Sequence, residues 1–246
     1  MREQHTLPED KSPGTSTLAS GPAGTHFEAQ VAASYMLAML AGAPARGLPG
    51  ASIDRVALQQ ANAGYPLDDV IIHGHDNISG KVAVLEVQVK RSIPFAASDP
   101  VFRKVVGQIV KASQRPDFST QRYELAIATT KGSRKIDGAY QDVLTLARQI
   151  SDATTFAAQI DLAGVANDDM RSFVKTFKTH LLDEGSPDDN ETVWFLLRRI
   201  QILTFDFTAP GSASHDLALE RALRILHADD GSRVGAFWGS LIELSI

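Results

Sequence analysis

The chain has 246 residues, of which 43% are hydrophobic, and its formal net charge is −5. This composition predicts a globular fold with a real core, as one large domain or a domain with a helical extension. The absence of cysteine excludes disulfides and thiolate metal sites, and no apolar run approaches the roughly 18 residues of a membrane span. With no signal peptide recognised, the expectation is a cytoplasmic protein that makes no membrane contact.

The beginning of the chain divides into a tail and a helix. Residues 1–24 are rich in Pro, Gly, Ser and Thr and show no apolar periodicity, which predicts a flexible tail. Thr25 and Glu28 have the spacing of a capping box, in which each side chain bonds the backbone of the other. They predict a helix that begins at Thr25 and ends at Met39 or Leu40.

Four strands and a second helix are predicted before residue 135. A strand is expected at 53–58, and two more in the segments PLDDVIIHG and KVAVLEVQVKRS, with a turn between them. YELAIAT, at 123–129, predicts a fourth. Asp99 and Pro100 form a good cap and first-turn pair for the intervening helix. Its apolar stripe is expected to comprise Val101, Phe102, Val105, Val106, Ile109 and Val110.

The sequence after residue 135 is mostly helical in character. Residues 201–207 are apolar and aromatic enough for a short strand, and helices are predicted at 138–150, 167–183, 190–199, 214–228 and 233–244. We therefore predict an α/β fold. A mixed β-sheet core flanked by helices would occupy residues 25–135, and a mainly helical extension would occupy 136–246.

A carboxylate, a carboxamide and an ammonium group are expected to meet where two neighbouring strands approach each other. Asp68 and Asp69 form an acidic turn that leads into one apolar strand. On the next strand Glu86, Gln88 and Lys90 share one face, because side chains alternate along a strand. Magnesium-dependent phosphodiester cleavage needs such hard oxygen ligands with a cation beside the phosphate.

The charge of the chain is unevenly distributed. Residues 81–135 contain 11 Lys or Arg against 4 Asp or Glu, whereas the rest of the chain contains 13 against 25. This basic block fits a phosphate-binding face, although a solvated charged face explains the count as well. The residues expected to contact nucleic acid are Lys90, Arg91, Ser92, Arg103, Lys104, Gln108 and Lys111.

The order of these residues resembles the PD-(D/E)xK nuclease superfamily, which has the restriction-endonuclease-like fold. In that superfamily a Glu on the first helix, an Asp leading the second core strand, and a Glu or Gln two residues before a Lys surround the metal. The matching positions here are Glu28 in GTHFEAQ, Asp69 in PLDDVII, and Gln88 with Lys90 in VQVK. Gln stands where Glu is more frequent, which removes one anionic ligand. The resemblance covers roughly residues 25–135.

The chain most resembles the double-strand DNA endonuclease domain that serves as an effector in bacterial antiphage systems. That domain occurs in cyclic-oligonucleotide-activated nucleases and at the front of STAND-type defence ATPases. The resemblance implies an antiviral, Mg²⁺-dependent endonuclease for which Mn²⁺ can substitute. It also implies activation as a homo-oligomer and, together with the apolar C-terminal run FWGSLIELSI, sensor or ATPase domains farther along a longer chain.

Each site residue has an expected role. Asp69 is the expected central metal ligand, and the other ligands are expected to be oxygens of Gln88, Glu28 and the Val89 backbone. Lys90 is expected to orient the attacking water and to balance charge in the transition state. Glu86 is expected to have a supporting or structural role.

Structural interpretations of the same residues stay open. Helix capping explains Glu28 equally well, and a turn before a strand explains Asp68 and Asp69. Gln88 and Lys90 could form the solvated face of an antiparallel strand. Of the acidic pair we favour Asp69, since adjacent residues point to opposite sides.

Two alternative functions follow from these interpretations. The chain could be a nuclease-like module that binds DNA without cleaving it, or a helical adaptor whose acidic C-terminal half binds another protein. No base-reading motif, such as a zinc finger or a winged helix, is recognised in the sequence. This favours a nuclease with little sequence specificity.

Overall fold

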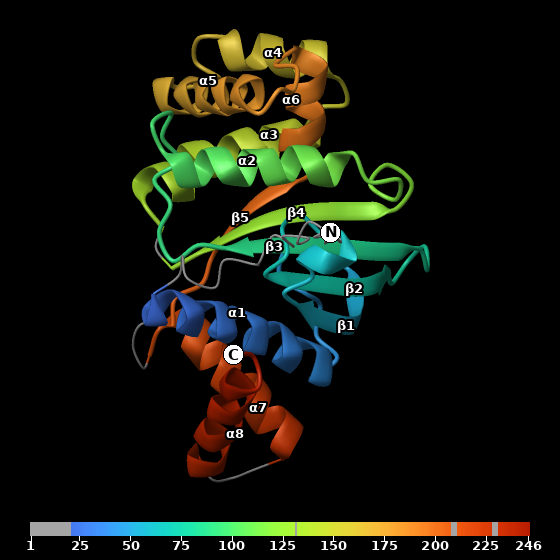
Figure 1. The fold of residues 1–246 in the computed structure, drawn as a ribbon, viewed down its shortest axis with the longest axis vertical. Coiled ribbons are helices and arrows are strands. Elements are labelled where there is room, and N and C mark those ends of the chain that lie inside the picture. The colour runs from blue at the N-terminus through green and yellow to red at the C-terminus, as the bar shows by residue number, and fades with distance from the viewer. Residues whose placement is uncertain (1–20, 131, 208–210, 228–230) are drawn as a thin grey trace, which may run out of the picture.

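The computed structural model describes residues 21–130, 132–207, 211–227 and 231–246. A five-stranded sheet forms the centre of this described part, and helices cover both of its faces (Figure 1). This arrangement confirms the predicted α/β class with a mixed sheet flanked by helices. Of the flexible tail predicted at residues 1–24, residues 1–20 lie outside the described residues. For residues 22–24 the prediction is wrong, because they belong to the first helix.

The strands follow one another across the sheet in chain order. They are β1 (Ala51–Leu58), β2 (Val70–Asp76), β3 (Val82–Val89), β4 (Arg122–Thr129) and β5 (Ile200–Thr204). The pairs β1–β2 and β2–β3 are antiparallel, whereas β3–β4 and β4–β5 are parallel. β3 is therefore the central strand, and its interior is buried on both sides, as the apolar run in its sequence favours.

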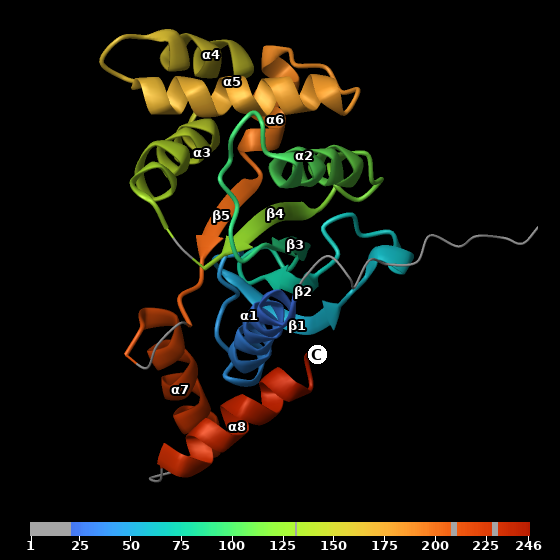
Figure 2. The same cartoon turned by 60° about the vertical axis from the view of Figure 1, so that its left-hand side comes forward.

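One group of helices covers the first face of the sheet. It consists of α2 (Pro100–Ser113), α3 (Gln141–Gln149), α4 (Ala153–Asp161), α5 (Asp168–Asp183) and α6 (Asn190–Leu197). α2 and α3 lie next to the sheet, and the other three lie farther out (Figure 1, Figure 2). A π-helical turn at Lys135–Tyr140 leads into α3. The sequence interpretation missed α4, which Asp152 caps by accepting a bond from the backbone N–H of Thr155 at 2.8 Å.

A second group covers the opposite face. α1 (Pro22–Leu40) lies against the sheet, and α7 (Ala213–Leu226) and α8 (Gly231–Glu243) pack beyond it (Figure 2). The prediction that the first helix begins at Thr25 is wrong: it begins one turn earlier, with Pro22 in the first turn, where its missing N–H costs nothing. A short 3-10 turn, η2 (Ala61–Ala63), connects β1 to β2.

α2 has the predicted cap and most of the predicted stripe. The Asp99 carboxylate accepts bonds from the backbone N–H groups of Val101 at 3.0 Å and Phe102 at 3.2 Å. The stripe from Phe102 to Val110 is buried against the sheet and α5. Val101 was predicted to belong to it and does not, because it is 38% exposed at the first turn.

The sheet extends across the predicted boundary at residue 135. β5 comes from the C-terminal part and pairs with β4, for example through Ile127 and Ile202. Residues 136–246 therefore complete the sheet and supply helices to both of its faces. No helix among the described residues is long and apolar enough to cross a membrane.

Gly74 marks a close approach between β1 and β2. β1 changes register between Ile53 and Arg55, opposite Gly74. A Cβ atom on Gly74 would stand 2.0 Å from the backbone oxygen of Ser52. Only a glycine fits this position, because the clash would be with backbone that the strand pairing holds in place.

Candidate active site

The candidate site lies at the edge of the sheet where β2 begins and β3 ends. Val70 pairs with Val87, so Asp69, which precedes β2, stands beside Gln88. The parallel strand β4 ends at the same edge, and the backbone N–H of Lys90 bonds the oxygen of Ala128 at 2.8 Å. Strand register thus brings together residues that are about 20 positions apart in the chain.

Asp69 is the centre of the polar contacts at this edge. Its Oδ2 accepts a hydrogen bond from the backbone N–H of Val89 at 2.7 Å and another from the amide of Gln88. Only 8% of Asp69 is exposed. Burial raises the pKa of this carboxyl above its usual value, while the Lys90 ammonium and the Val89 N–H oppose the rise. A positive charge placed here would be strongly favoured.

Lys90 places its ammonium group against the same carboxylate. Its Nζ lies 3.5 Å from Asp69 Oδ2 and donates a hydrogen bond of 3.0 Å to the backbone oxygen of Val89. The side chain is 28% exposed, so the group can also face a ligand from solvent. The predicted combination of carboxylate, carboxamide and ammonium is present at one place.

Glu28 reaches this edge from α1 and does not cap that helix. The N-cap position is Gly21, which makes no side-chain cap bond. The Glu28 carboxylate instead accepts a hydrogen bond from the Gln59 amide. Burial, followed by the nearby Asp69 carboxylate, raises the pKa of Glu28 to about 7, whereas Lys90 acts to lower it. Glu28 is therefore poised to change charge near neutral pH.

Gln59 is a residue of the site that sequence reasoning missed. Its backbone N–H bonds the oxygen of Asp69 at 3.3 Å, and its side chain bonds Glu28. It adopts a φ of 51°, which is uncommon for a residue other than glycine. Only the pairing of β1 with β2 reveals its place. A local signal was absent, since Gln59 simply follows the predicted strand.

The donor set fits a hard divalent cation. The Oε1 atom of Gln88 is buried without a hydrogen-bond partner, which is costly for a polar atom unless something binds it. It lies on the residue whose amide contacts Asp69, and Glu28 adds a second carboxylate. The described residues contain no group of three or more His, Cys, Asp or Glu side chains arranged for a metal. A metal would therefore depend on the Gln88 amide and the Val89 carbonyl as well as on the two acids.

Asp68 and Glu86 lie outside this donor set. Asp68 is half-buried, and its backbone oxygen bonds the N–H of Gln60 at 2.9 Å. Glu86 is fully buried and accepts bonds from the backbone N–H of Leu67 at 2.9 Å and from the Tyr123 hydroxyl. Burial raises its pKa to about 7. Glu86 thus holds the loop that precedes Asp69.

The interpretation of Gln88 as a solvated strand residue is wrong. Gln88 is 2% exposed, and it lies on the same face of β3 as Val84, which belongs to the core cluster that α2 shares. A buried carboxamide beside a buried carboxylate costs free energy in a structural strand. This placement favours a binding role.

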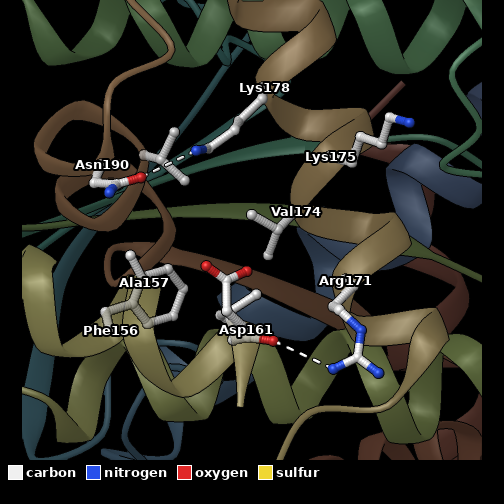
Figure 3. Close-up of a pocket in the computed structure, with 10 residues that line it drawn as sticks. Phe156, Ala157, Asp161, Arg171, Val174, Lys175, Lys178 and Asn190 are labelled. Carbon is white, nitrogen blue, oxygen red and sulfur yellow. Dashed lines mark hydrogen bonds between the residues drawn. The ribbon is translucent and has the colours of Figure 1, made fainter. Parts of the chain in front are cut away.

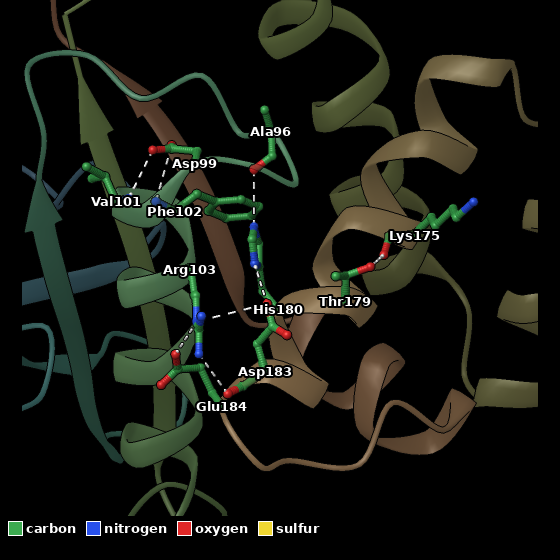
Figure 4. A network of polar contacts seen from close by, with 10 residues as sticks. All are labelled: Ala96, Asp99, Val101, Phe102, Arg103, Lys175, Thr179, His180, Asp183 and Glu184. Carbon is green, nitrogen blue, oxygen red and sulfur yellow. Dashed lines mark hydrogen bonds and ion pairs between the residues drawn. The ribbon is translucent and has the colours of Figure 1, made fainter.

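Two predicted phosphate contacts are occupied within the fold. Arg103 Nε lies 2.9 Å from Glu184 Oε1, and its guanidinium also donates to the backbone oxygen of Asp183, so it joins α2 to the end of α5 (Figure 4). Gln108 donates a hydrogen bond of 2.7 Å to the backbone oxygen of Pro66. Both side chains are bound within the fold, and Gln108 holds the loop before Asp69.

The other predicted contacts are exposed. Arg91 and Ser92 directly follow Lys90, and Lys104 and Lys111 lie on the outer side of α2. The charge count of the basic block nevertheless overstates its free charge. Five of its cations form ion pairs with carboxylates in the described part of the chain, namely Lys90, Arg103, Arg115, Arg122 and Lys135.

Comparisons with protein-family models, curated proteins and solved structures gave no match. The resemblance to the PD-(D/E)xK superfamily therefore stays a prediction from the motif residues.

Proposed function

We propose that this chain is a metal-dependent nuclease that hydrolyses phosphodiester bonds of double-stranded DNA. The observation that carries the proposal is the meeting of Asp69, Gln88 and Lys90 at one edge of the sheet, with the Gln88 Oε1 atom buried and unpartnered. Mg²⁺ or Mn²⁺ would be held by oxygens of Asp69, Gln88, Val89 and Glu28.

A bound divalent cation supplies a water of lowered pKa and positive charge beside the phosphate. The protein's own groups complete the chemistry. The Lys90 ammonium can hold the attacking water in line and oppose the negative charge that develops on the phosphate. Val89 N–H and Gln88 fix Asp69 in position, and Arg91 adds a cation at the same edge.

The choice of double-stranded DNA rests on the motif resemblance and on the exposed cations near the site. Phosphate contacts carry little sequence information, so we propose low sequence specificity. The proposed role as an antiviral effector, activated by oligomerisation, also rests on the resemblance.

The test is cleavage of supercoiled plasmid by purified protein with Mg²⁺ or Mn²⁺, at low salt and across a range of protein concentrations that would permit self-association. Wild type should nick and linearise the plasmid, and EDTA should stop it. Asp69→Ala and Lys90→Ala should lose about 100-fold or more in rate. Lys81→Ala removes an exposed cation at the opposite end of β3 and should cut normally.

The alternatives give different results in the same assay. A DNA-binding module would shift the plasmid in a gel in the presence of EDTA without nicking it under any condition. A protein-interaction adaptor would show no DNA affinity. Equal cutting by wild type, Asp69→Ala and Lys90→Ala would contradict the site.

A further inference from the structure

A cavity lies between α4, α5 and α6, away from the candidate active site. Its volume is about 200 Å³. A cavity of about 150 Å³ is enough to bind benzene, so this one can hold a substituted ring. Three helices supply its walls, and none of its lining residues belongs to the candidate active site (Figure 3).

The floor of the cavity is apolar. Phe156 and Ile160 come from α4, Val174 from α5 and Val193 from α6, and each of the four is less than 8% exposed. These side chains are held in place by the core on their other side. A small apolar group of a ligand can bind here without rearrangement of the backbone.

Charged groups of both signs line the cavity above this floor. Asp161, at the end of α4, directs its carboxylate toward Val174, and no described residue forms an ion pair with it (Figure 3). Lys178 donates a hydrogen bond of 3.0 Å to Asn190 Oδ1, which is neutral and leaves the ammonium charge uncompensated. Lys175, one turn earlier on α5, is exposed and also lacks a described acidic partner.

Arg171 also lines the cavity, but its guanidinium is already bound within the fold. It bonds the backbone oxygen of Ala166 at 2.7 Å and the Asp168 carboxylate at 3.0 Å. Its contacts with the backbone oxygens of Ile160 and Ala166 tie the end of α4 and the loop that follows it to α5. The polar groups left free are one carboxylate and two ammonium groups.

We propose that this cavity binds a small zwitterion with an apolar body, of the kind that a free aromatic or branched amino acid represents. The apolar part lies on the floor formed by Phe156 and Val174. The ligand's carboxylate faces Lys178, with Lys175 able to approach from the rim, and its ammonium group faces Asp161. A ligand with a single charge would form only one of the two ion pairs, which lowers its affinity.

Saturation-transfer NMR with three probes tests the proposal. Phenylalanine carries both charges, 3-phenylpropionate lacks the ammonium group, and phenethylamine lacks the carboxylate. Phenylalanine should bind wild type about tenfold more tightly than either single-charge probe. Competition by leucine would place the side chain of both amino acids in the same cavity.

Matched variants assign the binding to this cavity. Asp161→Asn and Lys178→Gln should each weaken phenylalanine binding about tenfold. Ala157→Phe should abolish it by filling the cavity, with circular dichroism confirming the fold. Lys81→Gln is the control, since it removes an exposed cation on the sheet and should bind normally. Equal binding of the three probes, unchanged binding in both charge variants, or no phenylalanine binding to wild type would each overturn the proposal.

Discussion

The backbone N–H of Val89 donates a hydrogen bond of 2.7 Å to the Asp69 carboxylate, so the end of β3 orients the acid that precedes β2. The same residue offers its backbone oxygen to Lys90 Nζ. One residue of a central strand therefore holds both the proposed metal-binding acid and the proposed catalytic cation. Six consequences of this arrangement and of the surrounding fold can be measured.

Metal affinity should depend on pH through Glu28. Its pKa of about 7 means that the carboxyl is protonated below neutral pH and must lose that proton to bind a cation. Mn²⁺ affinity measured by calorimetry should therefore rise between about pH 6 and pH 8. Glu28→Gln should bind more weakly at the higher pH and show a flatter profile.

The raised pKa of Glu28 also predicts how the free energy of unfolding of the metal-free protein changes with pH. The carboxyl of Glu28 ionises near its usual 4.5 in the unfolded chain but near 7 in the folded one. The unfolded state therefore loses its proton first, and the free energy of unfolding falls as pH rises through this window. Urea unfolding of Glu28→Gln should show a smaller fall, and an equal fall would contradict the assignment.

Replacing Gln88 with Glu should make the fold dependent on a divalent cation. Gln88→Glu replaces the amide that donates to Asp69 with a second buried carboxylate. Two like charges would then lie side by side. We expect the melting temperature in EDTA to fall by about 5 °C. Millimolar Mg²⁺ should reverse most of this fall in melting temperature. Gln88→Met also loses the hydrogen bond but adds no charge, so Mg²⁺ should raise its melting temperature less than that of Gln88→Glu.

Two substitutions of Gln59 separate the effect of backbone strain on stability from the effect of its side chain on metal affinity. Gln59→Gly and Gln59→Ala both lose the amide that holds Glu28, so Mn²⁺ affinity should fall about tenfold in each. Glycine tolerates the φ of 51° and alanine does not. Gln59→Gly should therefore be more stable than Gln59→Ala by about 1 kcal/mol in urea unfolding. Identical stability would show that the strain is absent in solution.

DNA affinity should distinguish Arg91 from Arg103. Arg91 is exposed next to Lys90, whereas Arg103 is bound to Glu184. Measured by fluorescence anisotropy with a duplex, Arg91→Gln should weaken binding and reduce the slope of log K against log salt by about 1. Arg103→Gln should leave the slope unchanged, and the reverse pattern would contradict the proposed DNA face.

The pairing of β1 with β2 should not survive a side chain at position 74. A Cβ atom on Gly74 would meet the backbone oxygen of Ser52 at 2.0 Å. Gly74→Ala should lower the free energy of unfolding by about 3 kcal/mol. Gly235 on α8 has open space around its Cβ position, so Gly235→Ala should be neutral or stabilise by up to about 1 kcal/mol.

Local patterns in the sequence were sufficient for most elements. Alternation predicted β3, and short apolar runs predicted other strands. Asp99 with Pro100 predicted the start of α2, because a cap is made by neighbours in the chain. Thr25 misled for the opposite reason: a capping-box spacing occurs there inside a helix whose first turn already holds Pro22. α4 was missed because only two large apolar residues, Phe156 and Ile160, mark its buried face.

For the site, the sequence by itself determined that Asp69, Gln88 and Lys90 come together. A short hairpin connects β2 and β3, and its register follows from chain connectivity. Only the tertiary structure decided that Gln59 holds Glu28, that Arg103 binds α5 and that Gln108 holds the loop at Pro66. These contacts join residues from elements that are not paired in one hairpin, so their partners depend on how helices pack on the sheet. Residue spacing carries no record of that packing.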